Sequence, residues 1–229
     1  MKIIALILSL LLLTSCSNPD TSGGVTLSRG GGDDANEFPD GACEGQHENT
    51  PDLNTGCGWI YNSVRQGYYI KPGADLRGAS LDGADLRHAN LERAILDSAY
   101  MPHVNLRYAN LVDAKLWGAT LSYANLRYAS LRGAKLWGAI LWGVDGVHAN
   151  LTNADLSGAY LRNAEMGGAI FRNANLSGAD LRGAWFTGSD IINNTSIDHF
   201  ADIKANSSTI CPNGATYGQM RFPRHDCPF

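Results

Sequence analysis

The feature that most constrains this chain is a five-residue repeat that runs without an insertion through residues 74–193. Ala opens 21 of its 24 units, and Leu or another apolar residue usually stands at the third position. An α-helix cannot use this spacing, because five residues place each Leu about 140° round the helix from the last and no apolar stripe forms. A straight strand fails as well, since an odd period turns successive Leu side chains to opposite faces.

The chain can keep Ala and Leu on one side only if it bends once in every unit. The first and third positions then point the same way along a short extended piece, and the next two residues form a corner, where Gly at the fifth position supplies backbone freedom. A second period supports this geometry, because residues 105–119 and 125–139 are identical at 12 of 15 positions. Four bends close a coil of twenty residues. We therefore expect about six coils, stacked in a solenoid roughly 29 Å long.

These units also resemble a known family. The motif Ala-(Asp/Asn)-Leu-x-x, seen at residues 74–76, 89–91 and 154–156, is similar to that of the pentapeptide-repeat proteins. The resemblance covers 120 of the 229 residues and implies an all-β, right-handed quadrilateral β-helix. One unit departs from the motif, since Gly146 stands where a buried Leu is expected. We expect a cavity or a bulged corner in that coil.

The first residues have the pattern of an export signal. A short basic start precedes an apolar run over residues 3–13, which is too short to span a membrane as a stable helix but suits a signal peptide. The sequence LTSC at residues 13–16 resembles the bacterial lipobox. That resemblance implies removal of residues 1–15, lipidation of Cys16 and sorting to the outer membrane. The alternative is ordinary secretion with a free Cys16.

Four further cysteines indicate two disulfide bonds, because an even number in an exported chain is typical of disulfide frameworks. Of the three possible pairings, the short spacings favour Cys43–Cys57 and Cys211–Cys227. A metal site is the alternative, but no CxxC pair is present.

The segments outside the repeat predict a tether and two end caps. Residues 16–40 have the composition of a disordered acidic tether. A solenoid end exposes apolar interior and unpaired strand edges, so it needs a cap. We assign that role to residues 41–73 and 194–229, each of which holds one pair of cysteines.

Positions two, four and five of each unit point outward, and side chains twenty residues apart stack along the solenoid. Trp, Tyr and Arg are enriched at binding hot spots, and two outward faces are rich in such residues. The candidate binding residues are Lys115, Trp117, Lys135, Trp137 and Trp142 on and beside one face, and Arg107, Tyr108, Arg127 and Tyr128 on the opposite face. The alternative is a structural ladder that only stabilises neighbouring coils, and we favour it narrowly for the tryptophans.

Charge and composition exclude several function classes. The net charge is −4, and the repeat itself holds eleven acidic and eleven basic residues. Family members that protect DNA gyrase resemble DNA through acidic surfaces, so a neutral, exported repeat argues against a DNA-mimic protector of a topoisomerase and against a nucleic-acid partner. No catalytic triad, stacked histidines or cleft can be recognised, so we expect neither an enzyme nor a metal or cofactor. An unrecognised enzyme remains an alternative.

The sequence therefore predicts a non-catalytic lipoprotein of the bacterial envelope. It would be held at the membrane by its lipid anchor. It would act as a rigid spacer, or as a scaffold that binds an envelope protein or glycan.

Overall fold

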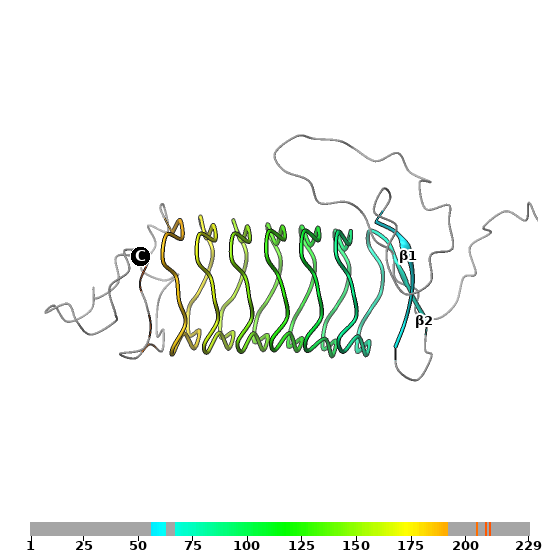
Figure 1. Ribbon diagram of the computed structural model, residues 1–229, viewed down its shortest axis with the longest axis horizontal. Coiled ribbons are helices and arrows are strands. Elements are labelled where there is room, and N and C mark those ends of the chain that lie inside the picture. Colours follow the sequence, from blue (N-terminus) through cyan, green and yellow to red (C-terminus); the bar gives the residue numbers. More distant parts are fainter. Residues whose placement is uncertain (1–55, 63–66, 192–204, 206–208, 210, 212–229) are drawn as a thin grey trace, which may run out of the picture.

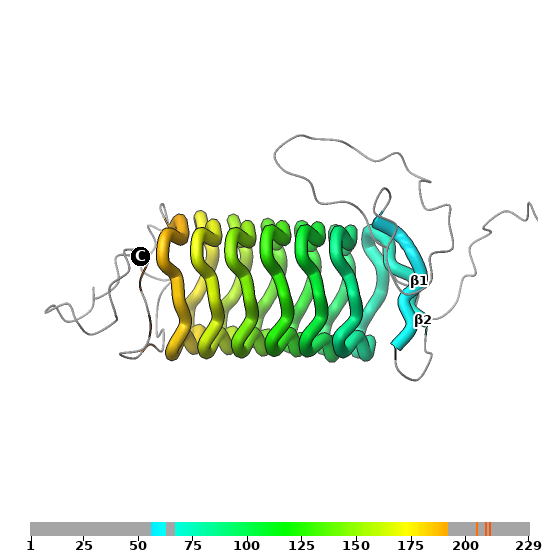
Figure 2. Tube along the Cα trace, viewed as in Figure 1, coloured from blue at the N-terminus to red at the C-terminus, as the bar shows by residue number. Residues whose placement is uncertain are grey.

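The computed structural model describes residues 56–62, 67–191, 205, 209 and 211. Within them the chain winds as a stack of coils along one axis (Figure 1). Parallel bridges join residues twenty apart, from Asp75↔Ile95 at one end to Ile170↔Asp190 at the other. The predicted all-β solenoid is confirmed, and each coil takes twenty residues. Figure 2 shows how regularly the coils follow one another.

Each pentapeptide closes with a tight turn at a corner of the coil. At the first corner the amide of Ala79 donates to the carbonyl of Leu76 at 2.9 Å, and Gly78 has a φ of 63°. A positive φ at the third residue of such a turn is typical of type II. All 24 corner residues spaced five apart from 73 to 188 have a positive φ, yet only 12 of them are Gly. Gly therefore makes half of the corners, and residues with side chains make the rest.

Backbone hydrogen bonds join each coil to the next. At one typical bridge, the amide of Ile95 donates to Ala74 at 2.8 Å, and the amide of Leu76 donates to Ile95 at 2.6 Å. The same pattern recurs along the repeat, so the coils satisfy one another's backbone groups. Ala at position one and Leu at position three fill the interior, and nearly all of them are at most 3% exposed. The solenoid is therefore held together by hydrogen bonds between coils and by one continuous hydrophobic core along its axis.

The coil that contains Gly146 has neither the predicted cavity nor a bulged corner. The amide of Ala149 donates to Gly146 at 2.9 Å, so the turn there is regular. A Cβ built on Gly146 would collide with the sulfur of Met166, which lies one coil further along and is buried. Met is long and flexible, and suits irregular gaps. Its side chain takes the interior space that Leu fills elsewhere.

A two-stranded antiparallel hairpin closes the N-terminal end. It consists of β1 (Gly58–Tyr61) and β2 (Gly67–Ile70). Ile60 and Ile70 belong to the same buried cluster as the solenoid interior, and the amide of Ser80 donates to the Tyr68 hydroxyl at 3.0 Å. These contacts cover the apolar end of the first coil, which lies beside β1 and β2 in Figure 1.

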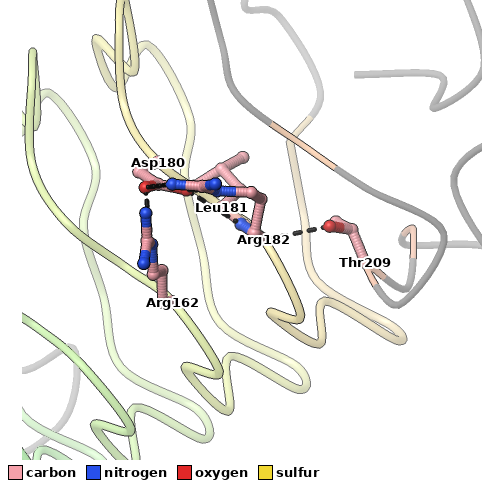
Figure 3. Close-up of polar contacts among 5 residues, drawn as sticks. All are labelled: Arg162, Asp180, Leu181, Arg182 and Thr209. Carbon is pink, nitrogen blue, oxygen red and sulfur yellow. Dashed lines mark hydrogen bonds and ion pairs between the residues drawn. The ribbon is translucent and has the colours of Figure 1, made fainter.

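At the other end, the hydroxyl of Thr209 donates to the carbonyl of Leu181 at 2.9 Å (Figure 3). Cys57 and Cys211 are buried and disulfide-bonded. Cys43 and Cys227 lie outside the described residues, so the predicted pairing stays a prediction. The predicted signal peptide, Cys16, the tether and most of both caps also lie outside them.

Candidate functional site: the outward faces of the solenoid

Exposed aromatic side chains gather on one face of the solenoid. That face is formed by the pentapeptides at residues 99–103, 119–123, 139–143 and 159–163, together with Trp117 and Trp137 in the turns that lead into it. We call it the aromatic face. Of nine large exposed aromatic side chains among the described residues, six belong to it, namely Tyr100, Trp117, Tyr123, Trp137, Trp142 and Tyr160.

The repeat places these rings in rows along the axis. Consecutive bridges join Tyr100, Thr120, Ile140 and Tyr160 down the middle of the aromatic face. The tryptophans at 117 and 137 line the edge where the chain enters, and Tyr123 and Trp142 line the edge where it leaves. Their side chains range from 43% exposed at Trp142 and Tyr160 to 62% at Tyr123. The arrangement is a set of exposed aromatic rings spread along one face of the solenoid.

Sequence reasoning found only part of this surface. It named the three tryptophans at 117, 137 and 142, but it missed Tyr100, Tyr123 and Tyr160. The tyrosines become visible only when residues are compared along the rows of stacked coils rather than within one pentapeptide. Tyr100 and Tyr160, for example, stand at the same position of the same face sixty residues apart. The ring contacts of the described residues do not include one between Trp117 and Trp137.

A continuous stack of rings lies on another face, among the fifth-position residues. His88, Tyr108, Tyr128 and His148 follow one another one coil apart, and each neighbouring pair has centroids 5.1 Å apart. We call these four side chains the ring column. Arg107, Tyr108, Arg127 and Tyr128, which the sequence offered as a second binding surface, lie in or beside it.

The two arginines of this second surface already have partners. The guanidinium of Arg107 lies over Tyr108, 4.8 Å from its centroid, and donates to its hydroxyl at 3.0 Å. Arg127 pairs with Asp145 at 3.1 Å, and this hydrogen-bonded carboxylate raises the pKa of the guanidinium. The geometry on this face is that of a structural ladder.

The face that precedes the aromatic face carries Lys115 and Lys135. They form a parallel bridge with each other, and both side chains are exposed. In the described part of the chain neither lysine has a carboxylate within ion-pair distance. Each is followed two residues later by a tryptophan of the aromatic face, Trp117 or Trp137.

Comparison with known proteins decides the family. Pentapeptide repeats, in eight copies, match residues 72–107, 99–138, 129–168 and 154–191, which together span 120 of the 229 residues. The chain belongs to the pentapeptide-repeat family. It matches no curated protein.

Several solved pentapeptide repeat proteins share part of the sequence. One from the Arabidopsis thaliana thylakoid lumen is 34% identical and covers 47% of this chain and 68% of its own, with a TM-score of 0.30. Another, from Nostoc PCC 7120, is 30% identical and covers 51% of this chain and 84% of its own, with a TM-score of 0.33. HetL, involved in heterocyst differentiation regulation in Nostoc sp. strain PCC 7120, is 24% identical. It covers 63% of this chain and 86% of its own, with a TM-score of 0.32.

Most arginines of this pentapeptide-repeat solenoid are neutralised by carboxylates. Seven of them pair, at residues 77, 87, 93, 127, 162, 172 and 182. Asp180 accepts from two, Arg162 at 2.7 Å and Arg182 at 2.6 Å, and Figure 3 shows both converging on it. At the N-terminal end the hydrogen bonds from Arg77 lower the pKa of Asp75. These pairs keep the solenoid faces locally neutral.

The described residues hold no group of three or more metal-binding side chains. What the solenoid faces offer instead is flat apolar surface, one pair of unpartnered lysines and a stacked ring column. Such surfaces can bind a partner.

Proposed function

We propose that this pentapeptide-repeat protein is a non-catalytic scaffold of the bacterial cell envelope, which is anchored by lipid at Cys16 and binds a partner through its aromatic face. The family does not by itself specify a function. The proposal is carried by one observation, the six exposed aromatic rings on one face.

An exposed aromatic face is unfavourable unless something covers it. Large contiguous apolar patches on a protein that is otherwise polar outside mark interaction sites. Trp and Tyr are also the residues that most often dominate binding energy. The face carries both, and the face that follows it along the chain is neutralised by ion pairs. This contrast supports a binding role for the aromatic face over a purely solvated one.

The rigid-spacer part of the proposal rests on the bridges. Each coil is bonded to the next along the whole repeat, from Asp75 to Asp190. A rod of this kind holds its surface residues at fixed spacing. It could therefore present the aromatic face at a defined distance from a membrane.

The anchor part of the proposal rests on residues 3–16, with their apolar run and LTSC sequence. Among the residues that the structure describes, no helix is long and apolar enough to cross a membrane. Two or more acyl chains give stable membrane attachment, where a single chain does not. Replacing Cys16 with Ala should abolish metabolic labelling with a fatty acid and release the chain from the membrane fraction. Labelling that persists in the Cys16→Ala variant contradicts the anchor.

The aromatic face is tested by removing its three tryptophans together. The triple variant Trp117→Ser, Trp137→Ser and Trp142→Ser should lose crosslinked partners in intact envelopes, because aromatic anchors contribute about 2 kcal/mol or more each at hot spots. Its melting temperature should fall little, since these side chains bury little area. The matched control is Trp185→Ser, which removes an equally exposed tryptophan (42%) from another face.

The two interpretations of the tryptophans predict opposite results. If they form only a structural ladder, the triple variant melts at a clearly lower temperature than wild type and keeps every partner. That outcome rejects the aromatic face as the binding surface.

A further inference from the structure

Two lysines break the charge pattern of the solenoid. Lys115 and Lys135 lie side by side across one bridge, exposed, while seven arginines of the described residues are paired with carboxylates. Like charges directly opposite each other across a bridge are destabilising. The Lys115–Lys135 contact itself therefore does not stabilise the solenoid, and a ligand that carries negative charge would relieve its repulsion.

The nearest carboxylates in the structure are directed elsewhere. Asp155, the next residue of the same row, accepts from the Ser157 hydroxyl at 2.7 Å and from Asn175 at 3.2 Å. On the coil before Lys115, Asp97 accepts from the backbone amide of Trp117 at 3.0 Å. Neither ammonium group has an ion-pair partner among the described residues.

The corner that leads into this face carries one charge of each sign. Arg132 is exposed there, and no carboxylate of the described residues pairs with it. Asp113 lies at the same corner, with its carboxylate over Gly133. The two charges roughly cancel. On the face itself Asp97 and Asp155 flank the lysine pair, so the positive charge is confined to the two coils that carry Lys115 and Lys135.

A tryptophan accompanies each lysine. Residues 114–118 and 134–138 are the same pentapeptide, Ala-Lys-Leu-Trp-Gly, one coil apart. Trp117 and Trp137 are 52% and 59% exposed. Each coil thus presents one cation and one indole, and the pair repeats after one coil step of about 4.8 Å. A ligand that engages both coils in the same way must itself repeat along the axis.

We propose that this strip, Lys115, Trp117, Lys135 and Trp137, binds a linear acidic polysaccharide that lies along the solenoid axis. The flat C–H face of a sugar ring packs on an indole, and the carboxylates of the chain pair with the ammonium groups. This inference rests on the proposed binding function and names its ligand class.

The backbone argues against an extended acidic peptide. A peptide that binds by strand addition needs a free strand edge. Here the strand edges along the flank are used in bridges between coils, from residue 75 to residue 190. A peptide would have to bind by side chains alone on a flat surface. A polysaccharide needs only the exposed rings and charges that the strip offers.

The test is a titration of the purified full-length chain with defined polymers at low salt. The probes are polygalacturonate as linear acidic polysaccharide, dextran as neutral polysaccharide, poly-L-glutamate as acidic peptide, and anionic phospholipid vesicles. Wild type should bind polygalacturonate most tightly, and more weakly as salt screens the charges.

Two variants separate the roles of charge and ring. The double variant Lys115→Gln and Lys135→Gln should lose about tenfold in affinity for polygalacturonate, because both ion pairs with the carboxylates of the polymer are lost. The double variant Trp117→Ser and Trp137→Ser should lose more. The matched charge control is Lys71→Gln, at the N-terminal end of the solenoid, which should bind like wild type. The lysine variant should melt no lower than wild type, since repulsion is removed.

The inference is overturned if polygalacturonate does not bind, if poly-L-glutamate or the vesicles bind as tightly, or if the lysine variant binds as well as wild type. Failure here leaves the proposed function standing when the triple tryptophan variant still loses its crosslinked envelope partner. If that variant keeps every partner as well, both proposals fail.

Discussion

Residues with side chains occupy half of the corners in a conformation that usually belongs to glycine. Twelve of the 24 corner residues are not Gly, although φ there is between 55° and 61°. An L-residue in this region costs about 1–2 kcal/mol relative to its ordinary conformations. Such strain persists when the surrounding structure dictates it. Here the hydrogen bond of the turn and the bridges on either side fix the backbone conformation, whichever side chain the residue carries.

Ser98 gives a direct measure of this strain, because it is exposed and has a φ of 58°. Ser98→Gly should stabilise the protein by roughly 0.5–1 kcal/mol, since relief of the strain exceeds the extra entropy that Gly loses on folding. Ser98→Val should destabilise it by about 1 kcal/mol, because a β-branched side chain tolerates positive φ poorly. Chemical denaturation of the two variants checks the order. Equal stability of the Gly and Val variants would contradict it.

The contrast between Gly and non-Gly corners shows where sequence reasoning stops at this scale. The five-residue period predicted the corner and its need for backbone freedom, as at Gly78. It did not predict that Tyr108 or Tyr128 would adopt the same conformation, because local preference disfavours it for bulky side chains. Stacking of one coil on the next decides the matter, and that is a contact between residues far apart in sequence.

At the scale of the element, the ring column follows from the direction of the fifth-position side chains. The longer ones lean over the fifth residue of the next coil. His148 shows this within the ring column, because a Cβ added to Gly168 would lie 2.6 Å from its Nδ1. The column therefore ends where the next coil has no side chain. A side chain at 168 would have to displace the ring beneath it, and the φ of 66° there also favours glycine.

Substitutions at Gly158 and Gly168 distinguish the cost of positive φ from the cost of contact with the ring. Gly158→Ala places its methyl group in open space and suffers only the strain of positive φ, about 1 kcal/mol. Gly168→Ala suffers the same strain and also displaces the His148 ring, so it should cost about 1 kcal/mol more. Thermal or chemical unfolding measures the difference. Adding His148→Ala to both variants should remove that difference, and its persistence would show that the ring is not the cause.

The aromatic face could be predicted only in part for a related reason. The positions of Trp117, Trp137 and Trp142 outside the core follow from the unit alone. Whether they form one surface with Tyr100 and Tyr160 depends on the order of faces and corners round the coil. That requires the four-unit coil to be followed over several turns of the solenoid, and a pattern of five residues does not display it.

At the scale of the whole molecule, segments outside the repeat cover the two ends of the solenoid, which the repeat itself would leave exposed. The hairpin of β1 and β2 covers one end, and Thr209 bonds to Leu181 at the other. Because each coil contacts only its neighbours, loss of an end exposes the next coil in turn. Stability of the rod therefore depends on its two ends out of proportion to their length.

The predicted disulfides belong to these ends. Non-reducing peptide mapping should recover Cys43 with Cys57 and Cys211 with Cys227. Each closes a loop of about 15 residues, which is worth roughly 3 kcal/mol on the chain-entropy model. Reduction should accordingly lower the melting temperature by several degrees. Recovery of a Cys43–Cys227 peptide would reject two independent caps.

The contact between Gly146 and Met166 has a consequence for how such a protein can evolve. A gene duplication that copies residues 115–134 adds one coil whose neighbours are nearly the same as before, so every interior contact survives. A copy of residues 127–146 would instead place one Gly146 above another, with no Met166 to fill the interior between them. A chain of this kind should therefore tolerate gain or loss of a coil within residues 115–134 and resist it where the copied segment includes Gly146.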